Sequence, residues 1–147
     1  MAQYKIYLVQ YSRFQFKKGD DRRHMGIVVE TDSTQEFGTT FHITGSEVAW
    51  TYERQRDVHF KHGSYCGSCV LGTMPASPAA LDALHKLLGT IALRHNEPTF
   101  NSQRWVWEAA LLMRERGYQV NPPTTFPSFI AAMHAAFDKW DVPTLSS

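Results

Sequence analysis

The two halves of the sequence have different hydrophobic periodicities, and this division constrains the fold more than any other feature. The first half alternates polar and apolar residues and is rich in β-branched and aromatic side chains, which predicts strands. We expect strands over residues 4–11, 24–30, 36–45 and 69–74. The segment 46–68 is ambiguous and is assigned only a short strand.

The second half has apolar residues at helical spacing and predicts three helices. The first follows Ser77, an expected N-cap, with Pro78 as its first residue. The second begins near Ser102 and stops at Gly117. The third follows the proline-containing, helix-breaking segment 121–127. Strands followed by helices predict an α+β fold, with an antiparallel sheet of about five strands packed against three helices.

The composition narrows the class of partner. The chain has 147 residues, of which 43% are hydrophobic, and its net charge of +1 gives no indication of nucleic acid or of a membrane surface. No apolar run approaches the roughly 20 residues of a membrane span. Residues 1–16 also lack the layout of a signal peptide. We therefore expect a single cytoplasmic domain over 1–147, whose oligomeric state stays open, with Cys66 and Cys69 as reduced thiols.

Two histidines are expected side by side in the hairpin formed by residues 24–30 and 36–45. With a five-residue loop centred on Ser33, the numbers of opposed residues sum to 66, and His24 faces His42. Opposed side chains share a face of the sheet, with Cβ atoms about 4.5–5.5 Å apart. The other face is expected to pack in the core and carries Met25, Ile27, Val29, Phe41 and Ile43. Two ordinary surface histidines are the alternative, and a slip of one residue would separate them.

Three short motifs follow one another along the chain, and together they have a parallel in a known family. They are HMGIVVE starting at His24, TTFHITG around His42, and NSQRWV starting at Asn101. Their order and spacing resemble the permuted branch of the NlpC-type papain-like superfamily. They are most similar to the lecithin retinol acyltransferase-like and small phospholipase/acyltransferase proteins, over roughly residues 4–117. The resemblance implies a permuted papain-like fold and no cofactor.

The resemblance also implies roles for individual residues. His24 would be the general base, His42 would orient its ring, and Ser102 would occupy the position of the nucleophile, where the family has cysteine. Such an enzyme acts on an amide, ester or thioester of a small molecule or peptide through an acyl-enzyme. We expect the Ser102 side chain within about 4 Å of the His24 ring. Candidates for substrate or oxyanion contacts are Asn101, Gln103 and Trp105.

Serine at position 102 departs from the family, and three explanations stay open. The natural residue is cysteine and was replaced, or the natural protein uses serine or is inactive, or Ser102 or Asn101 is simply a helix cap. A thiol at a helix start beside an imidazole ionises easily, whereas a serine hydroxyl needs the histidine to take its proton. A catalytically silent binding domain of the same fold is therefore the alternative function.

A cluster of possible zinc ligands lies within 11 residues: His59, His62, Cys66 and Cys69. Only three residues separate the histidine pair from the cysteine pair, fewer than in zinc fingers. The C-x-x-C motif precedes a strand-like segment, whereas redox motifs of this type open a helix. We expect no metal site and no redox role, and we expect these side chains to be exposed loop residues.

Overall fold

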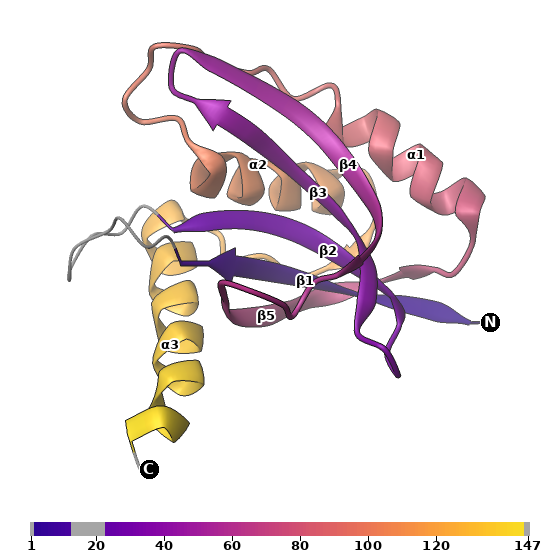
Figure 1. The fold of residues 1–147 in the computed structure, drawn as a ribbon. Helices are drawn as coiled ribbons and strands as arrows, with labels where there is room; N and C mark the ends of the chain where they lie inside the picture. The colour runs from indigo at the N-terminus through magenta and orange to yellow at the C-terminus, as the bar shows by residue number, and fades with distance from the viewer. Residues whose placement is uncertain (1, 13–22, 146–147) are drawn as a thin grey trace.

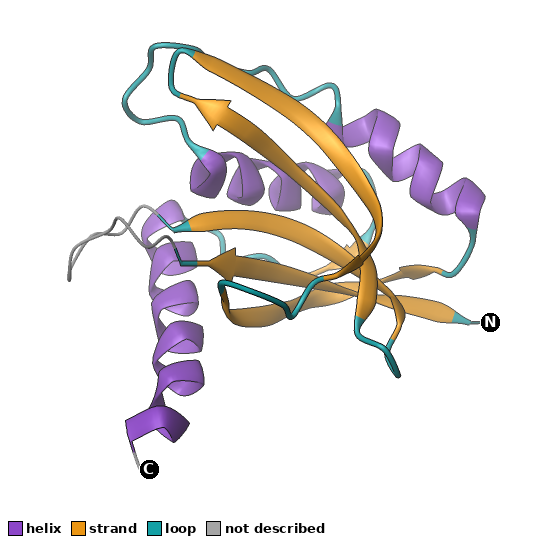
Figure 2. Cartoon of the chain, viewed as in Figure 1, coloured by secondary structure: helices purple, strands orange, loops and turns teal. Residues whose placement is uncertain are grey.

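In the part of the chain that the structure describes, residues 2–12 and 23–145 of a computed structural model, six strands form one antiparallel sheet (Figures 1 and 2). The strands are β1 (Gln3–Tyr11), β2 (His24–Asp32), β3 (Phe37–Ser46), β4 (Ala49–His59), β5 (Tyr65–Pro75) and β6 (Gln119–Val120). Their order in the sheet is β4-β3-β2-β1-β5-β6. Strands β1 to β4 therefore form a meander, and β5 returns to pair with the other edge of β1.

Three helices follow the strands within the same described residues. They are α1 (Pro78–Leu88), α2 (Ser102–Glu115) and α3 (Phe126–Leu145). Helix α2 packs on β2 and β3 (Figure 1). Helix α3 packs on β5, which is separated from β2 by β1 in the strand order. The predicted α+β class is thus confirmed, with a sixth strand of two residues added at one edge. No helix in the described residues has the length and hydropathy needed to span a membrane.

The main core lies between the sheet and α2, on the face that the hairpin pattern predicted. Every member of the predicted apolar face is at most 1% exposed: Met25, Ile27, Val29, Phe41 and Ile43. They pack with Trp105, Val106 and Met113 of α2. A second, smaller cluster on the opposite face contains Val9, Val28, Phe60 and Tyr65. The histidine face is therefore only partly covered by apolar side chains.

The register of the β2–β3 hairpin differs from the prediction by two residues. Val28 lies opposite Thr40, so the numbers of opposed residues sum to 68 rather than 66. The reason is the turn: Asp32 belongs to β2, and its carboxylate accepts hydrogen bonds from the N–H groups of Thr34 and Gln35 over 3.0 and 3.2 Å. A shift of two residues keeps every side chain on its predicted face.

The segment that was assigned only a short strand contains a full edge strand. Strand β4 has 11 residues and follows β3 through a turn at Glu47 and Val48. Strand β5 starts at Tyr65, four residues before the predicted strand 69–74, so that both cysteines lie within it. The strand expected in 46–68 is therefore present, but it is longer than predicted.

The first two helices, α1 and α2, each begin after an N-cap residue. Ser77 is the N-cap of α1, as predicted, and its hydroxyl accepts a hydrogen bond from the Ala80 N–H over 3.0 Å. Asn101, rather than Ser102, is the N-cap of α2. Helix α2 ends before Gly117, which has a φ of 89° and suits glycine. The hydroxyl of Ser102 is therefore not used as the cap of its own helix.

Candidate functional site

The two predicted histidines are in direct contact on the sheet face opposite the main core. His24 Nε2 lies 2.8 Å from His42 Nδ1, and the ring planes are inclined by 66°. Because of the two-residue shift, the pair is diagonal rather than opposed. Gly26 leaves room for it, since a Cβ atom there would lie 3.3 Å from the Cβ of His42 and 3.4 Å from Thr40 Cγ2. The predicted proximity of the two histidines is confirmed.

Glu53 on β4 extends the histidine pair to a row of three polar side chains across β2, β3 and β4. It is directly opposite His42 in the β3–β4 register, and its Oε1 lies 2.9 Å from His42 Nε2. Burial lowers the pKa of His42, and the hydrogen bond with Glu53 opposes this effect. Glu53 escaped prediction because the short strand expected in 46–68 was given neither bounds nor a partner, whereas β4 spans Ala49–His59 and pairs with β3. A two-residue turn at Glu47 and Val48 would have placed it opposite His42.

Ser102 is the first residue of α2, and its hydroxyl reaches β2. Its Oγ accepts a hydrogen bond from the backbone N–H of Met25 over 3.2 Å, and the residue is 5% exposed. The paired register of β2 and β3 ends at Ile27 opposite Phe41, so the Met25 amide lies beyond it. Figure 1 shows β2 and β3 diverging at this end, where α2 begins. Ser102 thus takes the place of a strand partner for β2.

The hydroxyl of Ser102 lies beside the backbone of His24, because Met25 is the next residue. His24 Nε2 is engaged with His42. The expectation that the Ser102 side chain lies within about 4 Å of the His24 ring stays a prediction.

Two buried glutamines contact Arg23, the residue just before His24, one at its backbone and one at its side chain. Gln103 Nε2 donates to the carbonyl oxygen of Arg23 over 3.2 Å. Gln10 Oε1 accepts from the Arg23 guanidinium over 3.1 Å, and Gln10 Nε2 donates to the carbonyl oxygen of Met133 over 2.7 Å. Gln103, a candidate for substrate contact, therefore also supports the entry of the chain into β2.

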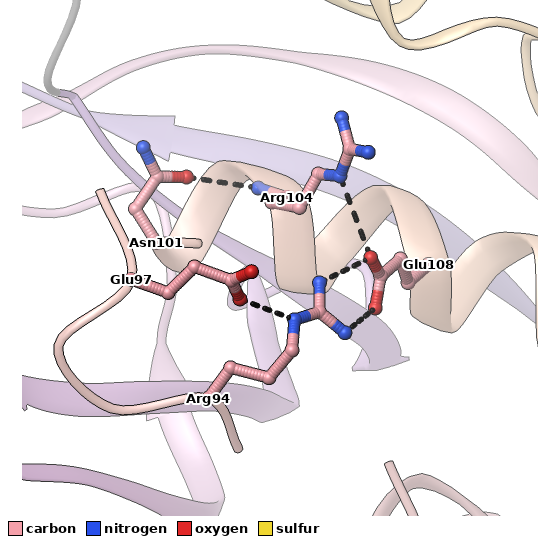
Figure 3. Close-up of polar contacts among 5 residues, drawn as sticks. All are labelled: Arg94, Glu97, Asn101, Arg104 and Glu108. Atoms are coloured by element: carbon pink, nitrogen blue, oxygen red, sulfur yellow. Dashed lines mark hydrogen bonds and ion pairs between the residues drawn. The ribbon is translucent and has the colours of Figure 1, made fainter. Parts of the chain in front are cut away.

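The start of α2 is fixed by a cap and by a group of ion pairs (Figure 3). Asn101 Oδ1 accepts a hydrogen bond from the Arg104 N–H over 3.0 Å. Arg94 contacts both carboxylate oxygens of Glu108, at 3.2 and 2.7 Å, and contacts Glu97 at 2.8 Å. These contacts join the loop before the helix to its second turn. The candidate role of Asn101 in substrate binding is thus accompanied by a structural one.

Trp105, the remaining candidate for substrate contact, lies in the core. It is 0% exposed, and its ring centroid lies 5.6 Å from that of Tyr52. At three residues beyond Ser102 it falls on the sheet-facing side of α2, where its indole fills the space between the layers. It therefore has no exposed surface to offer a substrate.

Two cavities flank the candidate site. The larger has a volume of about 490 Å³ and is lined in part by His24 and His42. The smaller has a volume of about 270 Å³ and is lined in part by Asn101 and Ser102. Gly45, near the end of β3, lines both cavities. One cavity therefore lies beside the histidines and the other beside Ser102, and both reach Gly45.

The four possible zinc ligands do not converge. The rings of His59 and His62 are 5.6 Å apart, but Cys66 is 4% exposed and its thiol points to the carbonyl oxygen of Gln10 at 3.6 Å. Cys69 is half-buried. The expectation that these cysteines are exposed loop residues is wrong, because β5 begins before both of them. Among the described residues, no group of three or more histidines, cysteines or carboxylates is arranged to hold a metal ion.

Comparison with known proteins gives one match. No curated protein and no solved structure matches the chain. The family of unknown function DUF6540 matches residues 6–119, well over half of the chain. The matched segment contains most of the sheet, the helices α1 and α2, both histidines, Glu53 and Ser102. The chain therefore belongs to the DUF6540 family.

Proposed function

We propose that this chain is an acyl-transfer enzyme of the papain-like type, in which Ser102 attacks an acyl carbonyl and His24 carries the proton. One observation carries the proposal: the hydrogen-bonded pair of His24 and His42 adjoins the start of helix α2. Ser102, the first residue of α2, accepts a hydrogen bond from the backbone amide of Met25, the residue after His24. This arrangement agrees with the resemblance to the permuted NlpC-type superfamily. It supports a hydrolase or acyltransferase acting on an amide, ester or thioester.

The proposed reaction has two steps, acylation of Ser102 and release of the acyl group. Ser102 Oγ attacks the carbonyl carbon, and its proton passes to His24 as the tetrahedral intermediate forms. The intermediate collapses when the leaving amine, alcohol or thiol takes this proton, and the acyl group stays on Ser102 as an ester. Water or another nucleophile then attacks the ester, with His24 again accepting and returning the proton. His42 holds the ring of His24 in place throughout.

The start of α2 favours the negative charge that develops on the carbonyl oxygen. The first backbone N–H groups of a helix point outward and carry the positive end of its dipole. Such groups stabilise an oxyanion when they are fixed before the reaction. The first turn of α2 contains no acidic residue that would oppose this charge. Ser102, as the first helical residue, is therefore at the most favourable point of the helix.

A catalytically silent binding domain is the second candidate. The observation that favours it is the Ser102 hydroxyl itself, which belongs to a residue only 5% exposed and already accepts the Met25 N–H. A serine in a site suited to a thiolate and an imidazolium is also harder to ionise than a cysteine. In this case the same cavities would bind an acyl compound without cleaving it.

The experiment that separates the two candidates is site-resolved alkylation of a Ser102→Cys variant. Iodoacetamide labelling is followed against pH by mass spectrometry, with and without His24→Ala. We expect the introduced thiol to react as a thiolate at pH values well below the ordinary cysteine pKa of about 8.5. His24→Ala should restore the pH profile of an ordinary cysteine. The same variant in denaturant supplies the reference thiol. If the pH profile matches this reference with and without His24→Ala, no thiolate–imidazolium pair forms between position 102 and His24. The binding domain would then be the remaining candidate.

A parallel measurement addresses serine directly. The unmodified chain is treated with a fluorophosphonate probe, and Ser102→Ala serves as the matched control. An active hydroxyl gives a phosphonylated Ser102 that disappears in the control and in His24→Ala. Equal labelling of all three proteins would show that Ser102 is not the reacting group.

A further inference from the structure

We infer that Glu53 is a positioning residue that fixes the tautomers of both histidines, so that the basic nitrogen of His24 is Nδ1. Its consequence for acyl transfer rests on the proposed function. Glu53 does not adjoin Ser102, because it lies on β4, two strands away from β2. It would act only through the ring of His42.

The first step is the geometry of the row. His42 and Glu53 are opposed residues of β3 and β4, and opposed side chains lie on the same face of the sheet. Their side chains are 10% and 41% exposed, and Nε2 and Oε1 are 2.9 Å apart. The backbone ladder thus places the two side chains opposite each other on the same face of the sheet.

The second step is the donor at His42. A carboxylate has no proton to give and can only accept hydrogen bonds. The hydrogen bond therefore requires a proton on His42 Nε2. Because burial lowers the pKa of His42, its neutral form is favoured, and a neutral imidazole has one N–H only. His42 Nδ1 is then left with a lone pair.

The third step transfers this direction to His24. His42 Nδ1 lies 2.8 Å from His24 Nε2, and since Nδ1 is the acceptor, His24 Nε2 must be the donor. A neutral His24 then has its lone pair on Nδ1. When His24 gains a proton during acyl transfer, it keeps its hydrogen bond to His42. Without a fixed acceptor at position 53, both tautomers could reverse, and the His24 lone pair would then point at His42.

Other charged or titratable side chains near the row contact other groups. The neighbouring arginines of β4, Arg54 and Arg56, contact Asp82 at 2.7 and 3.7 Å. His59, which lines the same large cavity, lies 3.7 Å from Glu36. Tyr11, whose ring centroid lies 6.2 Å from that of His24, donates its phenolic proton to the carbonyl oxygen of Phe60. Glu53 is thus aimed at His42 while these groups have other contacts.

The first test reads the tautomers directly by two-dimensional ¹H–¹⁵N NMR of the histidine side chains, at a pH where both rings are neutral. We expect the Nε2–H form for His42 and for His24. A predominant Nδ1–H form of His42 in the unsubstituted chain would overturn the inference without recourse to any variant.

The second test compares substitutions at position 53. Glu53→Ala should give mixed or reversed tautomers, and Glu53→Asp, which keeps a carboxylate, should restore part of the original form. Gln55→Ala is the matched control, because Gln55 lies on the same face of β4 as Glu53 and lines the cavity that His24 and His42 also line. Unchanged tautomers in Glu53→Ala, or an equal effect of Gln55→Ala, would contradict the inference.

The third test separates this inference from the proposed function. In the Ser102→Cys background, Glu53→Ala should slow alkylation near neutral pH by roughly tenfold, and Glu53→Asp should recover part of the rate. If His24→Ala slows alkylation but Glu53→Ala does not, the inference fails while the proposed function stands. If the tautomers respond to Glu53 but neither substitution alters the introduced thiol, the tautomer assignment stands and the proposed function fails.

Discussion

The backbone amide of Met25 donates a hydrogen bond to Ser102 Oγ over 3.2 Å, and this bond joins the two halves of the chain at the candidate site. The histidines and Glu53 belong to the meander of β2, β3 and β4, whereas Ser102 belongs to α2. Their alignment therefore depends on how α2 rests on β2. Any substitution that moves the start of α2 should displace Ser102 from His24.

Removing the cap of α2 should destabilise the protein. Asn101→Ala leaves the Arg104 N–H without its side-chain acceptor, and the expected loss is about 1 kcal/mol of unfolding free energy. Asn101→Asp keeps an acceptor and is the matched control, with a loss close to zero. Urea denaturation followed by circular dichroism measures both. Equal losses in the two variants would show that the cap does not contribute.

His42 should make the protein less stable in mild acid. Burial lowers its pKa in the folded state, so the unfolded chain binds more protons as the pH falls below the ordinary histidine value of about 6.5. The stabilisation is fully present above the pKa of the unfolded chain, and it is lost as the pH falls through the lower pKa of the folded state. NMR titration of the His42 ring should give a midpoint below 6.5, and a midpoint above it would contradict the prediction.

The free energy of unfolding checks the same linkage. Measured in urea between pH 5 and pH 7.5, it should decline toward the acid end, and His42→Gln should remove part of the decline. The remainder is expected in part from His85, whose pKa burial also lowers.

Cys66 should react slowly in the folded protein. Burial raises the pKa of its thiol to about 11, and burial also raises the pKa of Cys69. At pH 8 the folded chain should therefore be alkylated at either cysteine far more slowly than the chain in guanidinium chloride. Peptide mass spectrometry after timed iodoacetamide treatment gives both rates. Rapid labelling of Cys66 in the folded chain would show that β5 opens readily.

The raised pKa of Cys66 should also make the protein less stable at alkaline pH. The folded state keeps the Cys66 proton at pH values where the unfolded chain releases it. Its contribution is therefore complete below the ordinary thiol value of about 8.5 and is lost as the pH rises toward 11. Urea denaturation of the unsubstituted chain and of Cys66→Ala at pH 8 and pH 10 measures this contribution.

Trp105 should contribute to stability and not to ligand binding. Trp105→Ala empties a fully buried site and is expected to cost about 3–5 kcal/mol of unfolding free energy. Trp140→Ala is the matched control, because Trp140 is 50% exposed and should cost much less. Urea denaturation of the two variants tests the difference, and similar losses would place Trp105 outside the core.

The sequence predicted what depends on local patterns. Alternation identified the buried face of the β2–β3 hairpin, and side-chain chemistry identified Ser77 as a helix cap. The shared face of His24 and His42 followed from alternation alone, since a register error of two residues does not change faces.

What the sequence did not predict depends on less regular features. The register was set by hydrogen bonds from the turn to Asp32, which no count of loop residues reveals. Strand β4 is an edge strand whose residues are mostly exposed or half-buried, so it lacks the apolar alternation that marks an inner strand. The short strand expected in 46–68 was given no register, so the pairing of Glu53 with His42 was not predicted.

The meander also bears on the order in which the site is assembled during folding. His24 and Glu53 lie 29 positions apart with His42 between them, whereas Met25 and Ser102 lie 77 positions apart. Contacts between residues close in sequence cost less chain entropy and form sooner than distant ones. We therefore expect the contacts among the histidines and Glu53 to form before the contact between Met25 and Ser102. Under the proposed function, a nascent chain would have an ordered base before it has a nucleophile, and it would become reactive only once its core is complete.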